Sequence, residues 1–224
     1  PLDWLPSRTG AAAGMARKTK EEAAVTREGI LDAAVACFHE SGVAATTLAS
    51  IATRAGYTRG AVYWHFRNKA EVIAAVTARK RVSFVQRLEQ ASQSPDGRPL
   101  CNLRRALQAT FREIVREPRE RELVEVMIRH DLSNESAAIR ELQRQQEREE
   151  MRLFLRMLER AQALGQLRAG VDLESAVRLL WLSMAGALYG AMVAPHLLEI
   201  ERDGMASVDT VLASIAAPGT LEAR

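Results

Sequence analysis

Residues 47–69 decide the fold, and they read TLASIATRAGYTRGAVYWHFRNK. Thr47 and Thr58 each precede a short run with helical spacing, and a threonine oxygen accepts hydrogen bonds from the free N–H groups at a helix start. Gly56 lies between the two runs, where a tight turn needs a residue that tolerates positive φ. The stretch therefore predicts two short helices joined by a turn. The predicted helices cover residues 48–55 and 59–65.

The packing residues of this stretch indicate a helix-turn-helix. Ala52 is small enough for the second helix to cross closely, and Val62 is placed to pack back onto the first helix. A plain helical hairpin would share this spacing. The second helix, however, concentrates Arg59, Tyr63 and Trp64 in two turns, where a core helix would carry more apolar groups. Arginine reads guanine in the major groove, so these side chains favour DNA binding.

The composition is that of a globular, all-α protein. Of the 224 residues, 47% are hydrophobic and 26% are charged, and no long segment alternates apolar with polar residues as a strand does. The two cysteines fit neither a disulfide framework nor a metal site, so we expect no metal, no cofactor and a reducing cytoplasmic setting. Cys37 lies beside an apolar helix face, which favours a packing role over a redox role.

Positive charge gathers near the N-terminal end. Residues 15–81 hold eleven Lys or Arg against six Asp or Glu, a net charge of +5, whereas the whole chain carries +3. The remainder is therefore slightly acidic. This asymmetry is expected when one end of a protein meets phosphate.

The helical periods divide the chain into three parts. Residues 1–14 show no helical period and are expected to be a disordered leader, residues 15–68 form the DNA-binding domain, and residues 69–224 form a helical domain. A capping-box pattern at Thr19 predicts the start of the first helix, and Gly42 its end. About nine helices are expected. The later ones span roughly residues 68–91, 100–117, 123–128, 134–164, 172–194 and 203–216.

The N-terminal residues resemble a known family. The runs TLASIA from Thr47, RGAVYWHFRNK from Arg59, MARKTKEE from Met15 and TREGILDAA from Thr26 closely resemble the TetR family, and within it the regulators of multidrug efflux pumps. The strong match covers residues 15–76, whereas the remainder matches loosely. The resemblance implies a dimeric repressor that binds operator DNA.

The resemblance also implies which residues contact DNA. Basic residues before the first helix would follow the DNA backbone or enter the minor groove, and the helix-turn-helix would supply phosphate contacts and a reading edge. Tyr63 and Phe66 have an alternative role as anchors of the domain core. The expected contacts are Arg17, Lys18, Thr47, Thr58, Arg59, Gly60, Ala61, Tyr63, Trp64, His65 and Lys69.

An uncharged stretch from Leu179 to Leu198 is long enough to cross a bilayer. Its small and polar residues, and the lack of flanking positive clusters, favour instead a helix buried on several sides. The last helix shows a narrow apolar stripe typical of a helix-packing seam. The last two helices of each subunit would then form a four-helix dimer core. The expected interface residues are Ala185, Leu188, Met192, Met205, Val208, Leu212 and Ile215.

Apolar and aromatic residues of the larger domain could line a cavity for a hydrophobic or amphipathic effector, because methionine and aromatic side chains adapt to varied ligands. Plain core packing is the alternative for each of them. His130 could orient a ligand or form a surface ion pair with Asp131. The expected ligand-binding residues are Phe84, Leu88, Leu107, Phe111, Met127, His130, Phe154, Met157, Trp181, Met184 and Tyr189.

These observations predict a homodimeric repressor that a small hydrophobic compound releases from a palindromic operator, with an efflux operon as the implied target. A regulator of lipid or small-metabolite pathways is the alternative. No Ser/His/Asp or Cys/His constellation and no glycine-rich phosphate loop occurs as a motif, so we expect no enzyme. A DNA-packaging module without a ligand would bind DNA without operator preference.

Overall fold

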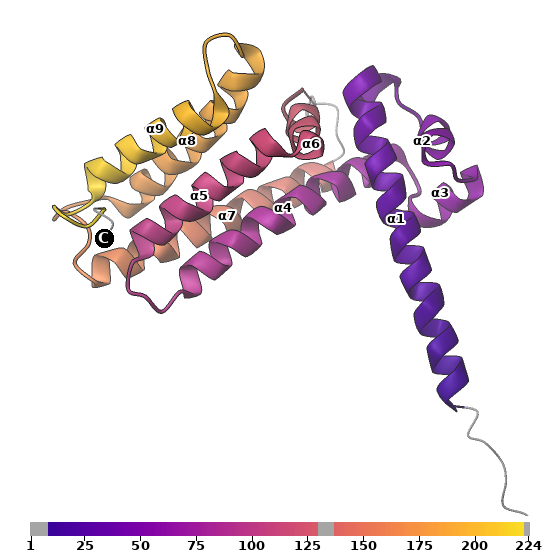
Figure 1. Ribbon diagram of the computed structural model, residues 1–224, viewed down its shortest axis with the longest axis horizontal. Coiled ribbons are helices and arrows are strands. Elements are labelled where there is room, and N and C mark those ends of the chain that lie inside the picture. Colours follow the sequence, from indigo (N-terminus) through magenta and orange to yellow (C-terminus); the bar gives the residue numbers. More distant parts are fainter. Residues whose placement is uncertain (1–8, 130–136, 222–224) are drawn as a thin grey trace, which may run out of the picture. The chain divides into compact units, whose positions relative to one another are not determined.

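The computed structural model describes the backbone of residues 9–129 and 137–221 (Figure 1). Its regular secondary structure is helical, apart from one isolated bridge between Leu167 and Ala216, which confirms the all-α class. The nine helices of the described residues are α1 (Thr9–Ala45), α2 (Leu48–Ala55), α3 (Arg59–His65), α4 (Lys69–Gln93), α5 (Pro99–Arg116), α6 (Pro118–Arg129), α7 (Ala137–Ala163), α8 (Leu173–Val193) and α9 (Ile200–Ile215).

The chain divides into two compact units, residues 1–76 and residues 77–224. The sequence placed this border at the start of α4. In the structure, the first two turns of α4 go with the first unit, and their apolar residues Val72, Ile73 and Val76 are buried. α4 therefore begins in one unit and continues without a break into the other.

α1 differs from the expectation at its start and agrees with it at its end. The helix runs through Thr19 from Thr9, so the predicted start at Thr19 is wrong, as is the absence of helix over residues 9–14. The segment is rich in alanine and free of proline, so helix continues through it. Gly42 has φ of 77° and ψ of 157°, which breaks the helical geometry where the sequence indicated.

The core of the first unit forms from the residues that the helical period indicated. Ile30, Leu31 and Phe38 of α1 are buried. Cys37 is buried beside them, and burial raises the pKa of its thiol, although the nearby Arg54 opposes the shift. This protonated, shielded thiol fits a packing role.

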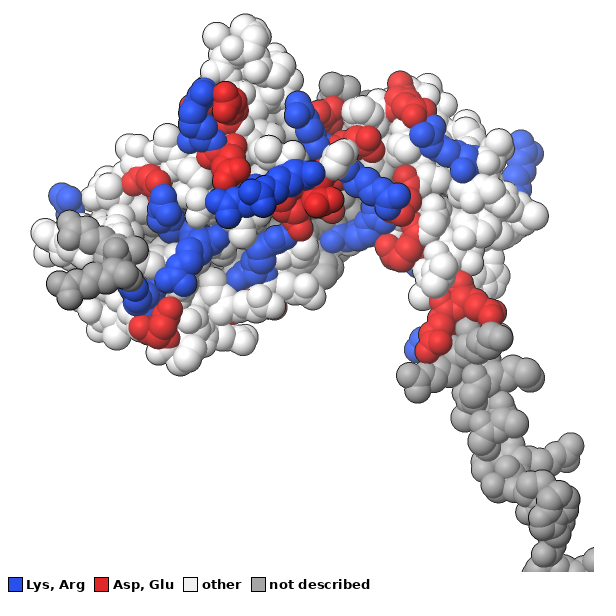
Figure 2. All heavy atoms as spheres, in the orientation of Figure 1, with Lys and Arg blue, Asp and Glu red and all other residues white. Residues whose placement is uncertain are grey.

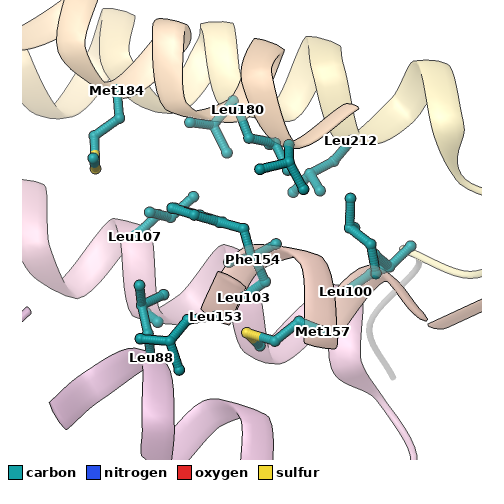
Figure 3. Close-up of a cluster of buried hydrophobic side chains, with 14 of the residues drawn as sticks. Leu88, Leu100, Leu103, Leu107, Leu153, Phe154, Met157, Leu180, Met184 and Leu212 are labelled. Carbon is teal, nitrogen blue, oxygen red and sulfur yellow. The ribbon is translucent and has the colours of Figure 1, made fainter. Parts of the chain in front are cut away.

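The second unit holds one contiguous apolar core, built from α4, α5, α6, α7, α8 and α9. Figure 3 shows Leu180 and Met184 of α8 and Leu212 of α9 on one side, with Leu107 of α5 and Phe154 of α7 opposite them. The chain segments after α7 and α9 meet at the bridge between Leu167 and Ala216. These helices therefore form a layered bundle around shared side chains.

Three helices of the second unit overlap the expected segments, and two of them, α6 and α9, begin earlier than expected. α6 starts at Pro118, because proline suits the first turn of a helix, and the predicted apolar run is only its second half. α9 starts at Ile200, and Asp203 accepts a hydrogen bond from the backbone N–H of Glu199 at 2.7 Å. Asp172 caps α8 as predicted.

Ion pairs fasten α5 to α9 on the surface of the second unit. Arg104 contacts Asp209 at 2.7 Å, and Arg112 contacts Glu201 at 3.0 Å. Figure 2 shows basic and acidic side chains interleaved over this face, whereas the tip of the α8–α9 hairpin is white. Exposed ion pairs contribute at most about 1 kcal/mol each, so the apolar core supplies most of the stability.

α8 is also the one described helix that is long and apolar enough to cross a membrane, with a mean hydropathy of 1.5. The core helix of a globular unit meets the same criterion. One side of α8 is buried, through Ala176, Val177, Leu180, Met184 and Ala191. The opposite side is exposed, so in the single subunit α8 is buried on one side only.

Candidate nucleic-acid interface

α2 begins at a complete capping box. The Thr47 side chain accepts a hydrogen bond from the backbone N–H of Ser50 at 3.1 Å, and the Ser50 side chain accepts one from the backbone N–H of Thr47 at 3.0 Å. Both side chains are exposed. The first turn of α2 therefore presents hydroxyl groups beside the free N–H groups of a helix start, which is an arrangement that binds phosphate.

The turn after α2 takes the conformation that Gly56 allows. Gly56 has φ of 72° and ψ of 21°, and the backbone N–H of Tyr57 donates to the Ala52 carbonyl at 3.0 Å. Tyr57 lies over Gly29 of α1, where a Cβ would stand 3.2 Å from the tyrosine oxygen. This close approach explains a glycine in the middle of α1.

α3 has a buried side and an exposed side. Val62 is fully buried, and Phe66 just after the helix is 3% exposed, so both face the core. Tyr63 and Trp64 are 57% and 74% exposed, which excludes the alternative of a core role for Tyr63 within the first unit. Arg59 is exposed one turn before Tyr63. The exposed side therefore combines a guanidinium with two aromatic rings that carry hydrogen-bonding tips.

The other predicted contacts of α3 lie around this exposed side. Thr58 caps the helix by accepting the backbone N–H of Ala61 at 3.1 Å, and Gly60 is exposed. The ring of His65 meets that of Trp64 edge to face, with centroids 4.6 Å apart. Burial lowers the pKa of His65, and the positive charge of Arg27 lowers it further. His65 is therefore a neutral hydrogen-bonding group at neutral pH.

Lys69 differs from the other predicted contacts. Its ammonium donates to the carbonyl oxygens of Val43 and Ala44, at 2.6 and 3.0 Å, and the side chain is half-buried. The side chains of Arg17 and Lys18 lie outside the described residues. Their contribution to DNA binding remains an expectation.

Two residues that support this site were missed from the sequence. Ser50 completes the capping box in the place that usually holds Glu or Gln, so a search for those residues passes over it. Arg27 of α1 lies over the ring of Phe66, with its guanidinium carbon 5.2 Å from the centroid. No local pattern reports this contact, because the two residues are far apart in sequence.

Comparison with known proteins identifies the family. The family model described as bacterial regulatory proteins, tetR family, matches residues 30–76, and that of the C-terminal region of MAATS-type transcriptional repressors matches residues 98–216. The chain belongs to the TetR family. The resemblance inferred from the helix-turn-helix residues is therefore confirmed.

Several TetR-family proteins are similar over nearly their whole length. The transcriptional regulator TtgR of Pseudomonas putida is 34% identical over 200 residues, which is 88% of this chain and 95% of TtgR. A solved complex of SmeT with triclosan is 44% identical, with a TM-score of 0.82 over 89% of this chain and 98% of that one. SmeT represses the Stenotrophomonas maltophilia efflux pump SmeDEF. These relatives are transcriptional regulators, and SmeT acts on multidrug efflux.

The second unit carries the C-terminal region of this TetR-family chain, and it gathers most of the predicted ligand-binding residues in one core. Met127 and Tyr189 do not join this core, because they are 38% and 58% exposed. His130 lies outside the described residues. The residues that share the core are Phe84, Leu88, Leu107, Phe111, Phe154, Met157 and Met184, with Trp181 packed against them.

A charged side chain lies next to this core. Arg87 of α4 donates from Nη2 to Glu113 of α5 at 2.5 Å. Its Nε atom is buried and, among the described residues, has no hydrogen-bond partner. Arg87 was not among the predicted ligand-binding residues, because an arginine between Phe84 and Leu88 has the sequence pattern of a surface residue. A buried guanidinium N–H without a partner is a donor available to a ligand.

The predicted dimer stripe of α9 is buried within the single subunit of this TetR-family chain. Met205, Val208, Leu212 and Ile215 are at most 7% exposed in the single subunit, because α5 and α8 already cover them. Leu188 and Met192 of α8 are half-buried against the same core, and Ala185 is half-buried. None of the four α9 residues retains enough surface to pack against another subunit.

A different stripe is exposed, and it lies on α8. Its members are spaced alternately by three and four residues, as in a helix-packing seam. The large ones are between 50% and 62% exposed. The members of this α8 stripe are Leu179, Leu182, Gly186, Tyr189 and Val193. The spacing was visible in the sequence, but α8 has no charged residue after Arg178, so periodicity alone does not show which side faces outward.

Proposed function

We propose that this TetR-family chain is a cytoplasmic, dimeric repressor that binds a palindromic operator and leaves it when a hydrophobic compound binds. The exposed side of α3 is the observation that supports operator binding. Arg59 offers a bidentate donor for guanine, and Tyr63 and Trp64 offer large contact area at a helix that is short enough to enter a major groove.

The α8 stripe supports a symmetric dimer. An exposed apolar row spaced by three and four residues pairs well with a copy of itself, because a two-fold axis places the same patch on both partners. Gly186 in the middle of the row allows close approach. Two copies of α3 related by this axis would read half-sites about 34–36 Å apart. The operator is therefore proposed to be a near-palindrome.

The core of the second unit supports effector binding. Its aromatic and methionine side chains suit a hydrophobic molecule, and Arg87 Nε offers a hydrogen bond to an acceptor on that molecule. SmeT, at 44% identity, was solved with triclosan, which is a hydrophobic molecule whose oxygen atoms can accept hydrogen bonds. By this likeness, the regulated genes are those of a multidrug efflux pump.

The test is a selection of bound duplexes from a random pool, followed by titration of the selected duplex with triclosan and a panel of hydrophobic antimicrobials. We expect a palindromic consensus, bound by two subunits at a ratio to random duplex of at least about 10³. We also expect one compound to lower this affinity while leaving the protein folded. Binding without sequence preference would contradict the operator, and a preference that no compound affects would contradict the effector.

A further inference from the structure

Lys69 joins two parts of the first unit that are distant in sequence. After the break at Gly42, the last turn of α1 leaves backbone carbonyls without helical partners, as every helix end does. The Lys69 ammonium, from the first residue of α4, donates to the carbonyls of Val43 and Ala44 at 2.6 and 3.0 Å. A cation at this end also interacts favourably with the helix dipole.

Thr46 also holds the segment from Gly42 to Thr47, which forms the α1–α2 corner. This buried side chain donates to the Gly42 carbonyl at 2.8 Å and lies 3.2 Å from the Cys37 carbonyl. The next residue, Thr47, caps α2 and presents its first turn. Lys69 and Thr46 thus hold the short segment that sets the position of Thr47.

We propose that Lys69 is a positioning residue, which fixes the α1–α2 corner to the first turn of α4 and so orients Thr47 and the start of α2 for DNA, instead of binding a phosphate itself. This inference rests on the proposed operator binding. Two of the three ammonium N–H groups are already used, and transfer of the ammonium to a phosphate would leave both carbonyls without this partner.

The same contact gives α4 a direct route to the recognition surface. α4 continues from Lys69 to Gln93, beyond the end of the first unit at residue 76. A displacement of its first turn would act on α3 through the connecting chain and on the corner before α2 through Lys69. Operator affinity then depends on Lys69 through the placement of Thr47.

Two measurements on Lys69→Gln test this role, since glutamine removes the charge and shortens the side chain. The first is amide hydrogen exchange of the free protein. The backbone N–H groups of Ser50 and Ile51 bond to the Thr47 side chain and carbonyl, so their exchange is expected to accelerate about tenfold when the corner loosens. Arg67→Gln is the matched control, because it removes a neighbouring positive charge without touching the corner.

The second measurement is the dependence of operator affinity on salt. Each phosphate contact contributes about 0.9 to the slope of log affinity against log salt. A positioning role predicts weaker binding with an unchanged slope, together with the faster exchange. A slope reduced by about 0.9 per subunit, or unchanged exchange at Ser50 and Ile51, would overturn the proposal. Absence of operator binding in the wild type would refute the proposed function, while the exchange measurement would still test the corner.

Discussion

α3 and α8 both expose large side chains, but the two helices expose different chemistry. On α3, the exposed residues are Arg59, Tyr63 and Trp64, so each one carries a hydrogen-bond donor at its tip. On α8, the exposed stripe holds aliphatic residues such as Leu182, with Tyr189 as its one polar tip. The α3 surface therefore has a donor on each of its large side chains, whereas the α8 stripe is mainly aliphatic.

This difference indicates the kind of partner each helix meets. Base edges and phosphates present hydrogen-bonding groups, so a surface that reads DNA needs donors at defined positions. Another copy of the α8 stripe presents mainly apolar groups, so close packing is its main requirement. Both surfaces expose large residues, and the polar tips on those residues distinguish a surface that suits nucleic acid from one that suits protein.

The largest effect is expected where a charge enters the apolar stripe. Leu182→Glu would place a carboxylate from each subunit near the two-fold axis, where an unpaired buried charge costs several kcal/mol. We expect a folded monomer, with operator affinity lower by roughly 10³-fold or more, because two linked heads no longer bind together. Ultracentrifugation and a gel-shift titration measure the two quantities.

Leu164→Glu is the control for this change, because Leu164 is 50% exposed but lies in the turn after α7, outside the α8 stripe. It should remain dimeric and bind the operator as the wild type does. A dimeric Leu182→Glu would contradict the assignment of α8 as the subunit interface.

The next largest effect concerns the donors of α3. Arg59→Ala is expected to cost about 1–3 kcal/mol of operator affinity in each half-site, since a bidentate pair with guanine is lost. Arg59→Lys keeps the charge but not the planar pair of donors, so it should keep the salt dependence and lose discrimination at one base position. Selection of bound duplexes with each variant measures this. Equal base preference for the wild type and Arg59→Lys would exclude Arg59 from base reading.

Local patterns predicted the first unit well. The caps at Thr47 and Thr58, the turn at Gly56 and the buried face of α1 depend on residues close in sequence, so their types and spacing were sufficient. The contacts of Lys69 were not predictable in this way. They join residues separated by 25 and 26 positions, and an ammonium suits both a phosphate and a helix end.

The second unit shows where sequence patterns stop. α9 has one apolar stripe, which could face either its own subunit or another one, and only the packing of α5 and α8 decides that it faces inward. α8 has no charged residue after Arg178, so the stripe that remains exposed there depends on which side its neighbours cover. Burial of this kind is a property of the assembled bundle and not of any single helix.

A pair of glycine substitutions sharpens the distinction between the two sides of α8. A Cβ at Gly204 of α9 would stand 3.0 Å from the Phe111 ring and 3.1 Å from the Ala187 Cβ, behind the exposed stripe. Overpacking costs about 1–3 kcal/mol, and the gain in helix propensity offsets up to about 1 kcal/mol. Gly204→Ala should therefore lower the free energy of unfolding by about 1 kcal/mol in a denaturant titration.

Gly186→Ala is the counterpart within the exposed stripe, because a Cβ there has no neighbour within 4 Å in the single subunit. We expect it to leave the subunit as stable or more stable, by at most about 1 kcal/mol, and to weaken the dimer by preventing close approach. An unchanged dimerisation constant, measured by ultracentrifugation, would show that Gly186 lies away from the helix contact.

The smallest effect distinguishes the two helices by pH. His65 at the end of α3 is a titratable group, whereas the exposed stripe of α8 contains no histidine, carboxyl or amine. Burial first, and then the charge of Arg27, holds the pKa of His65 below its ordinary value of 6.5. The unfolded chain therefore binds this proton more readily than the folded one, and its contribution to stability is complete above 6.5 and declines as the pH falls toward the lower, folded pKa.

His65→Gln should remove that decline. We expect the wild type to lose more stability than the variant between about pH 7.5 and about pH 5.5, as measured by urea unfolding followed by circular dichroism. The carboxyl of Glu71 does not confuse this window, because its pKa is lowered from 4.5 and its contribution is lost only in more acidic solution. Identical pH dependence in the two proteins would mean that the pKa of His65 is not lowered in the folded chain. Operator binding can be measured at the same two pH values with the dimer that carries His65→Gln. Equal binding at both would separate the hydrogen-bonding part of the α3 surface from its charge. The apolar surface of α8 has no such charge.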